Sequence, residues 1–95
     1  MGMGYALTEE IRFENGEIFD SNFGTYTIPR FSWVPEIKTV LVENSSLAPQ
    51  GGGEPAIICM GAVIASAIYD QTGAKLFQFP MTPERVKAAL EKAVT

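Results

Sequence analysis

The feature that most constrains the fold of this chain is a continuous apolar run from Ala56 to Tyr69, in which the only hydrophilic side chain is the hydroxyl of Ser66. The length and composition of the run predict a helix. Apolar side chains go all the way round that helix instead of forming one stripe, which is typical of a helix surrounded by protein on every side. The run is shorter than the about 20 residues that cross a bilayer, so we expect it to be buried in protein.

The chain that has to cover this helix is short. Its 95 residues are 46% hydrophobic and 19% charged, which is the profile of one globular unit. A domain of this size has a thin core, and one more helix with a few strands covers one face of a helix more easily than all of it. Three explanations stay open: a central core helix of a small α+β protein, oligomerisation through this helix, or a chain that belongs to something larger.

The charged and metal-binding side chains argue against several classes of function. The net charge is −4 and the seven Lys and Arg residues are scattered singly, so the chain offers no basic stripe to nucleic acid or to an anionic membrane surface. Without His, and with Cys59 as its single cysteine, it lacks an ordinary zinc site, a His-based triad and an internal disulfide. No secretory pattern opens the sequence. We therefore expect a cytoplasmic protein with no nucleic-acid partner and no membrane segment, in which Cys59 is an inert core residue.

The first half of the sequence predicts a helix end and short strands. The opening MGMGYALTEEI is rich in helix formers and places Met3, Leu7 and Ile11 on a shared face, without a capping residue of its own. The pair Asn15-Gly16, between alternating residues, predicts a tight antiparallel hairpin. Residues 36–44, EIKTVLVEN, give the strongest strand signal because β-branched residues dominate them.

The second half predicts two helices with a short strand, AKLFQF, between them. Pro55 suits the first position of the apolar helix, and Gly73 can end it. Thr82 can cap the last helix, which has one apolar face. The expected fold class is α+β, with a small antiparallel or mixed sheet, an N-terminal helix end, a buried apolar helix (about 55–71) and a C-terminal amphipathic helix (about 82–93).

A lone carboxylate stands in the loop QGGGEP, residues 50–55. Glu54 lies between three glycines and Pro55, at or beside the start of the apolar helix. The glycines let the backbone approach a bulky group closely and offer amide groups to polar oxygens. A phosphate-binding loop is the obvious alternative, but no Lys-Ser or Lys-Thr pair follows, and a carboxylate at the helix start repels phosphate. The loop therefore predicts another kind of site, in which Glu54 is the candidate reactive group.

Several motifs follow one another in order: ALTEE near the N-terminus, Y-x-I-P from Tyr26 to Pro29, VPEI at the start of the predicted strand, GGGEP, AIYDQTG and MTPERV. Together they resemble the C-terminal part of the large, molybdopterin-binding subunit of the molybdenum hydroxylases, the xanthine dehydrogenase and aldehyde oxidase family. The resemblance covers essentially all 95 residues. The GGGEP form looks closest to isoquinoline 1-oxidoreductase-like members.

The resemblance implies roles for the residues of the loop. In that family the glutamate of the GxGEP loop stands beside the molybdenum and acts as a general base, and the matching residue here is Glu54. No residue of this chain is implied as a metal ligand. The sequence departs from the family at Ala56, where a second proline is common, which alters the helix entry and leaves the carboxylate in place. Residues implied to line the molybdopterin-type molybdenum cofactor are Gln50, Gly51, Gly52 and Gly53.

The resemblance implies that residues 1–95 are a single unit, the C-terminal fragment of a larger molybdopterin-binding domain. The whole enzyme would be an oxidoreductase that hydroxylates a carbon of an N-heterocycle or an aldehyde with oxygen derived from water. Its expected partners are the remainder of the large subunit, an iron–sulfur subunit or domain and the small-molecule substrate. We expect the isolated chain to hold no cofactor and to be inactive. The alternative is a free-standing small binding or assembly module that buries its apolar helix against a partner or in a homodimer.

Overall fold

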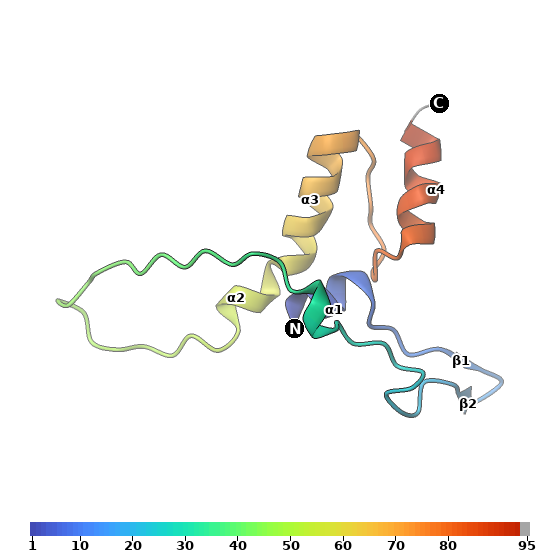
Figure 1. Ribbon diagram of the computed structural model, residues 1–95, viewed down its shortest axis with the longest axis horizontal. Helices are drawn as coiled ribbons and strands as arrows, with labels where there is room; N and C mark the ends of the chain where they lie inside the picture. The colour runs from blue at the N-terminus through green and yellow to red at the C-terminus, as the bar shows by residue number, and fades with distance from the viewer. Residues whose placement is uncertain (94–95) are drawn as a thin grey trace.

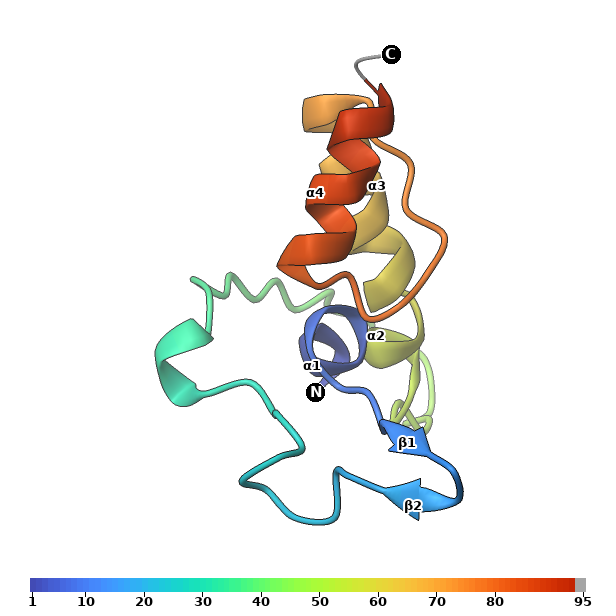
Figure 2. The ribbon, with the colours of Figure 1, turned by 90° about the vertical axis from the view of Figure 1, so that its right-hand side faces the viewer.

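The computed structural model describes residues 1–93 as short elements spread over 54 × 38 × 25 Å (Figure 1). Within these residues the strands form one two-stranded antiparallel sheet, which together with the helices confirms the α+β class. Figure 2 shows α1 end-on below the α3 and α4 helices, with the hairpin leading away from it. The elements are α1 (Gly2–Leu7), β1 (Phe13–Glu14), β2 (Glu17–Ile18), a 3₁₀ turn (Phe31–Trp33), α2 (Pro55–Ile58), α3 (Met60–Thr72) and α4 (Pro83–Ala93).

The first helix, α1, packs against α2 and α3 through its smallest residues. Gly2, Gly4 and Ala6 are buried, and a Cβ at Gly2 would overlap the side chain of Met60. The predicted apolar face is less enclosed than expected, because α1 ends at Leu7 and Ile11 lies beyond it, half exposed. No side chain caps the first turn of α1. Small residues thus form the contact because they let the helices approach closely.

The hairpin is the one that the sequence predicts. Strands β1 and β2 pair Phe13 with Ile18 and Glu14 with Glu17. Asn15 and Gly16 have φ angles of 50° and 82°, the left-handed conformation that a type I′ turn requires at both central positions. The hairpin signal is local and is therefore confirmed.

An ion pair closes the base of this hairpin. The backbone N–H and Nε–H of Arg12 donate to Oδ2 of Asp20 over 2.7 and 3.0 Å, and Nη2 of Arg12 lies 2.7 Å from Oδ1. The Asp20 side chain is 1% exposed. The hydrogen bond from the Arg12 guanidinium, followed by the one from its backbone, holds the pKa of the Asp20 carboxyl below its usual value. This ionised carboxylate joins Arg12 and Asp20, the residues on either side of the two strands.

The prediction of two further strands is wrong for this structure. Residues 36–44 are extended and fully exposed, and they form no ladder. The AKLFQF segment after Gly73 also runs without a partner strand. A β-strand is stable only against a neighbouring strand, and residues 1–93 place no strand beside either segment. In Figure 1 the first segment projects from the body of the molecule as the outgoing arm of a long loop.

The predicted apolar helix is present but interrupted. Helix α2 begins at Pro55, α3 begins at Met60, and Cys59 lies between them. Gly73, with a φ of 73°, ends α3, and its N–H donates to the Tyr69 carbonyl over 2.7 Å. The two helix-ending signals of the sequence are therefore confirmed, whereas the continuous helix over about 55–71 is two helices.

The predicted burial of this helix is wrong within the chain. No residue of α2 or α3 is buried, and Cys59 is exposed instead of lying in a core. Some residues of the two helices are half-buried, because α1 packs against both helices and the Phe79 ring lies against Gly61 of α3. By length and composition alone, Pro55–Thr72 also qualifies as a candidate membrane span, a test that the core helix of a soluble protein passes too. The absence of a membrane segment therefore stays a prediction.

The last helix, α4, begins as predicted. The Thr82 side chain accepts a hydrogen bond from the backbone N–H of Arg85 over 3.4 Å. The backbone N–H of Glu84 and the Thr82 side chain lower the pKa of the Glu84 carboxyl at this helix start. The Arg85 guanidinium donates to the Pro80 carbonyl over 2.9 Å and to the Glu10 carboxylate over 2.8 Å. These bonds fasten α4 to the end of α1.

The described residues enclose little core. Among the hydrophobic side chains only Ala6, Ala74 and Met81 are buried. The chain exposes 8148 Å², whereas a folded monomer of this mass exposes about 5,400 Å². Its radius of gyration is 17.2 Å, against about 12 Å for a compact domain of this length. Much apolar surface that a domain normally buries is therefore open to solvent.

Candidate functional site

The three glycines lie on the returning limb of the exposed loop, directly before the start of α2. Residues 44–53 leave the extended segment, turn, and return to the start of α2 (Figure 1). A Cβ added at Gly51, Gly52 or Gly53 would meet no atom within 4 Å. These glycines therefore leave open space where a side chain would otherwise stand.

Glu54 occupies the N-cap position of α2, which agrees with its predicted place. Its carbonyl accepts hydrogen bonds from the N–H groups of Ile57 and Ile58 over 2.8 and 3.2 Å. Its side chain is exposed and does not cap the helix. Within residues 1–93 no hydrogen bond or ion pair holds the Glu54 carboxylate. The backbone of Glu54 is thus fixed by α2 while its carboxylate is available.

A hollow of about 540 Å³ lies beside Gly53. It opens between α1, the start of α2 and the chain just after the 3₁₀ turn, and its lining is largely apolar. Of the predicted site residues only Gly53 reaches it, while Gln50, Gly51, Gly52 and Glu54 do not line it. Sequence reasoning missed this hollow because it depends on contacts between distant parts of the chain. Its lining residues are Met1, Gly2, Met3, Val34, Pro35, Ile37, Gly53, Ala56, Ile57 and Met60.

The loop suits one side of a cofactor site and no metal site. No group of three or more His, Cys, Asp or Glu residues that could hold a metal ion occurs in the described part of the chain. The open glycine backbone and the exposed carboxamide of Gln50 fit a bulky, polar organic cofactor, because amide groups there are free to face its oxygens. The structure thus leaves this backbone, the Gln50 carboxamide and the Glu54 carboxylate accessible to a large polar group.

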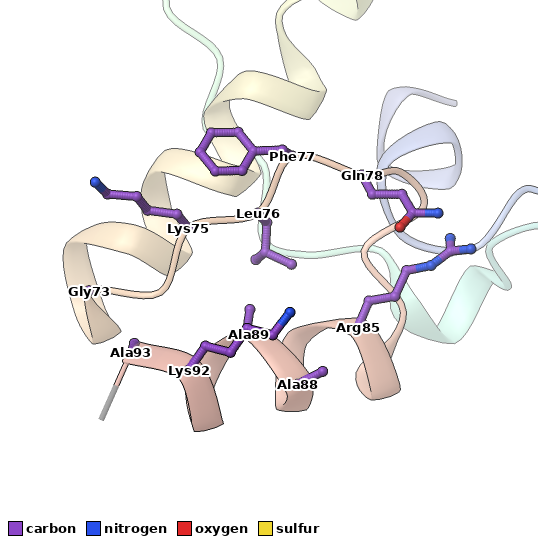
Figure 3. Close-up of a pocket in the computed structure, with 10 residues that line it drawn as sticks. All are labelled: Gly73, Lys75, Leu76, Phe77, Gln78, Arg85, Ala88, Ala89, Lys92 and Ala93. Carbon is purple, nitrogen blue, oxygen red and sulfur yellow. The ribbon is translucent and has the colours of Figure 1, made fainter. Parts of the chain in front are cut away.

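A second hollow, of about 650 Å³, separates α4 from the segment that follows α3 (Figure 3). Leu76 points across it toward Ala88 and Ala89, and Phe77 points the other way. Basic side chains also line it, including Lys75, which lies 5.9 Å from the ring centroid of Tyr69. None of the predicted site residues lines this hollow. It marks a face of α4 that the rest of the chain leaves incompletely packed.

Comparison with known proteins gives this loop its context. No protein-family model matches the chain. The chain is 37% identical over 84 residues to a nicotinate dehydrogenase subunit of Pseudomonas putida, a match that covers 88% of this chain and 7% of that protein. It is 33% identical over 92 residues to the xanthine dehydrogenase molybdenum-binding subunit of Escherichia coli, covering 90% of this chain and 12% of that subunit. It is 27% identical over 101 residues to the aldehyde oxidoreductase molybdenum-binding subunit PaoC of Escherichia coli, a match that covers 99% of this chain and 14% of that subunit.

The similarity extends over nearly the whole chain, but the chain spans only a small part of these relatives, between 7% and 14% of their lengths. Two of the three relatives are molybdenum-binding subunits by name, and all three are subunits of oxidoreductases. Over the segment that it shares with these subunits, the chain belongs to the molybdenum hydroxylase family, that of xanthine dehydrogenase and aldehyde oxidase.

Proposed function

We propose that this chain is part of the molybdopterin-binding subunit of a molybdenum hydroxylase, near its C-terminus, and that Glu54 is the general base of the reaction. The observation that carries the proposal is the exposed Glu54 carboxylate, which no residue of the described part of the chain holds. It follows directly after three glycines whose backbone is open to a large group. The relatives are many times longer than this chain, so the other walls of the site belong to the remainder of the subunit.

The proposed reaction is the hydroxylation of a carbon atom in an N-heterocycle or an aldehyde. The relatives named for nicotinate, xanthine and aldehydes support these two substrate classes. A bound molybdenum cofactor supplies a two-electron oxidation, in which C–H and water become C–OH with release of two protons, and iron–sulfur clusters of a partner subunit or domain accept the two electrons. Cytoplasmic location belongs to the same proposal.

This chain contributes a proton acceptor for the reaction and room for the cofactor. A carboxylate oxygen of Glu54 takes one proton as the oxygen from water attacks, and α2 fixes the position of the Glu54 backbone. Gly51, Gly52 and Gly53 keep side chains away from the cofactor, and the carboxamide of Gln50 is exposed for contact with the pterin. No other wall of the site comes from these residues, so we expect the isolated chain to hold no cofactor and to catalyse no hydroxylation.

The test is Glu54→Gln in the complete enzyme. A positioned general base contributes about 10²–10⁴-fold in rate, so turnover should fall by that factor while the molybdenum content stays unchanged. Glu17→Gln is the matched control, because it removes another exposed carboxylate, on β2 and outside the loop, and should leave turnover close to that of the unmodified enzyme. Normal turnover of the Glu54→Gln enzyme would remove Glu54 from the mechanism.

A further inference from the structure

The segment of residues 36–43 has the properties of a strand without its sheet. Val40, Leu41 and Val42 are 86%, 89% and 87% exposed. Within residues 1–93 no backbone N–H or C=O group of the segment forms a hydrogen bond. The one ion pair in the segment, between Lys38 and Glu36 at 3.7 Å, is exposed on both sides. Nothing in the described chain therefore accounts for the β-branched, apolar composition of this segment.

The alternation of side chains indicates what would cover the segment. In an extended chain Ile37 and Leu41 point to one face, while Val40 and Val42 point to the other. Apolar residues on both faces are typical of a strand that is covered from both sides, unlike a strand at a solvent-facing surface. A helix packed on one side would bury one of these pairs only. Pairing with a strand inside a covered sheet would bury the apolar side chains on both faces and would also supply hydrogen-bond partners for the backbone.

We propose that residues 36–43 pair through their main chain with a strand in the remainder of the molybdopterin-binding subunit, and that this pairing fixes the near end of the glycine loop. The inference rests on the proposed function. The remainder of the subunit is chosen as the occupant because this chain spans only 7% to 14% of its relatives, which leaves most of each subunit to supply the sheet. The chain also exposes on the order of 2,700 Å² more than a compact monomer, whereas one side of a typical interface between separate proteins buries only about 800 Å².

The pairing has a consequence for the position of Glu54. Residues 44–53 join residue 43 to the start of α2, and only the α2 end of this loop is held in the described chain. A loop held at one end leaves its glycine backbone free to move relative to a bound cofactor. Pairing of residues 36–43 would hold the other end, so the strand acts as a positioning element for the loop. A misplacement of about 1 Å in an active site can reduce the rate about 10²-fold.

The first test is hydrogen exchange in the complete, molybdenum-loaded enzyme. The backbone amides of residues 37–43 should exchange at least about 100-fold more slowly than those of an unstructured peptide, as amides of a core strand do. Exchange at the unstructured rate would overturn the proposal. Protection that disappears on dilution of an enzyme dimer to an intact monomer would assign the partner strand to a second copy, and would overturn it as well.

The second test is Val42→Pro in the same enzyme, with Val42→Thr as its matched control. Proline removes the N–H that would join the ladder, whereas threonine keeps the N–H and the β-branched shape. The Val42→Pro enzyme should lose protection at residues 37–43 and up to about 10²-fold in kcat, with its molybdenum retained. If the Val42→Pro and Val42→Thr enzymes have the same kcat, the strand does not position the loop, and the positioning role is contradicted. If Val42→Pro does not fold, hydrogen exchange in the unmodified enzyme still decides the pairing.

The two proposals can fail independently. If Glu54→Gln keeps normal turnover while residues 37–43 are protected, the catalytic role falls and the strand pairing stands. If Glu54→Gln loses turnover while these amides exchange freely, Glu54 keeps its role and the strand pairing falls.

Discussion

Asp20 and Glu54 are carboxylates in opposite surroundings. Asp20 is buried and receives three hydrogen bonds from Arg12, whereas the Glu54 side chain is exposed and receives none from the described residues. A carboxylate that is held by a guanidinium is stabilised in its ionised form and joins two parts of a fold. A carboxylate without a protein partner keeps its oxygens available for a substrate or a proton. This contrast distinguishes a structural carboxylate, Asp20, from the carboxylate that we propose to be reactive, Glu54.

The Asp20 carboxyl should make the hairpin sensitive to acid. Its pKa is lower in the folded chain than in the unfolded one, so its contribution to stability is fully present above the unfolded value of about 3.9 and is lost as the pH falls through the folded value. NMR titration of the Asp20 side-chain carbon should give a midpoint below that of an unstructured peptide. Asp20→Asn should remove this pH dependence and speed exchange of the Phe19 amide, whereas Glu14→Gln, on the same hairpin, should not. A normal midpoint for Asp20 would show that the ion pair does not form.

At the scale of elements, the sequence predicts what local chemistry decides. The Asn15-Gly16 turn, the start of α2 at Pro55, the end of α3 at Gly73 and the start of α4 after Thr82 all depend on neighbours within a few residues, and all are confirmed. The position of Glu54 beside a helix start was predictable for the same reason. The absence of a strand at residues 36–44 was not predictable, because strand formation depends on a partner strand, and the sequence of the segment does not show whether one is present.

The contacts of α1 explain why other parts of the site escaped prediction. The hollow beside Gly53 exists only because α1 meets α2 and the chain after the 3₁₀ turn. Such contacts follow from the tertiary arrangement, which a pattern of neighbouring residues does not encode. The exposure of Cys59, where a core position was expected, has the same origin, because none of the described residues covers that side of the helix.

The end of α3 provides a prediction for a single element. Gly73 has a φ of 73° and open space at its Cβ position, so a substitution there acts only through backbone strain. Gly73→Ala should destabilise the last turn of α3 by about 1–2 kcal/mol, and Gly73→Asn by less, because asparagine tolerates this conformation. The measurement is hydrogen exchange of the backbone amide at residue 73, which donates to the Tyr69 carbonyl. Equal exchange in the alanine and asparagine variants would contradict the role of the left-handed conformation.

At the scale of the whole molecule, the described chain is an open arrangement of elements around a few small buried residues. The extended arm, the hairpin and α4 all reach away from the contact between α1 and α3 (Figures 1 and 2). A chain that buries so little apolar surface gains little stability from the hydrophobic effect. The surface that remains open is the surface that we expect the remainder of the subunit to cover.

The isolated 95-residue polypeptide should therefore behave as an incomplete unit. We expect it to bind a hydrophobic dye, to unfold without a sharp transition and to aggregate or elute as an expanded monomer in size-exclusion chromatography, because its apolar arm and helices are exposed. The complete subunit, measured in parallel, should bind little dye. A stable homodimer with a cooperative transition would instead support the alternative of a free-standing assembly module.

The bond between Arg85 and Glu10 joins residues that are 75 positions apart in the sequence. During synthesis at about 5–20 residues per second, Glu10 is added to the chain about 4–15 s before Arg85. For that interval the chain just after α1 lacks its bond to α4, and until Thr72 has been added the small-residue face of α1 also lacks a complete α3. The hairpin and the single helices can form as they emerge, but the joining of the two ends comes last. Protection of the nascent chain by a chaperone would therefore be needed most before α4 has been translated.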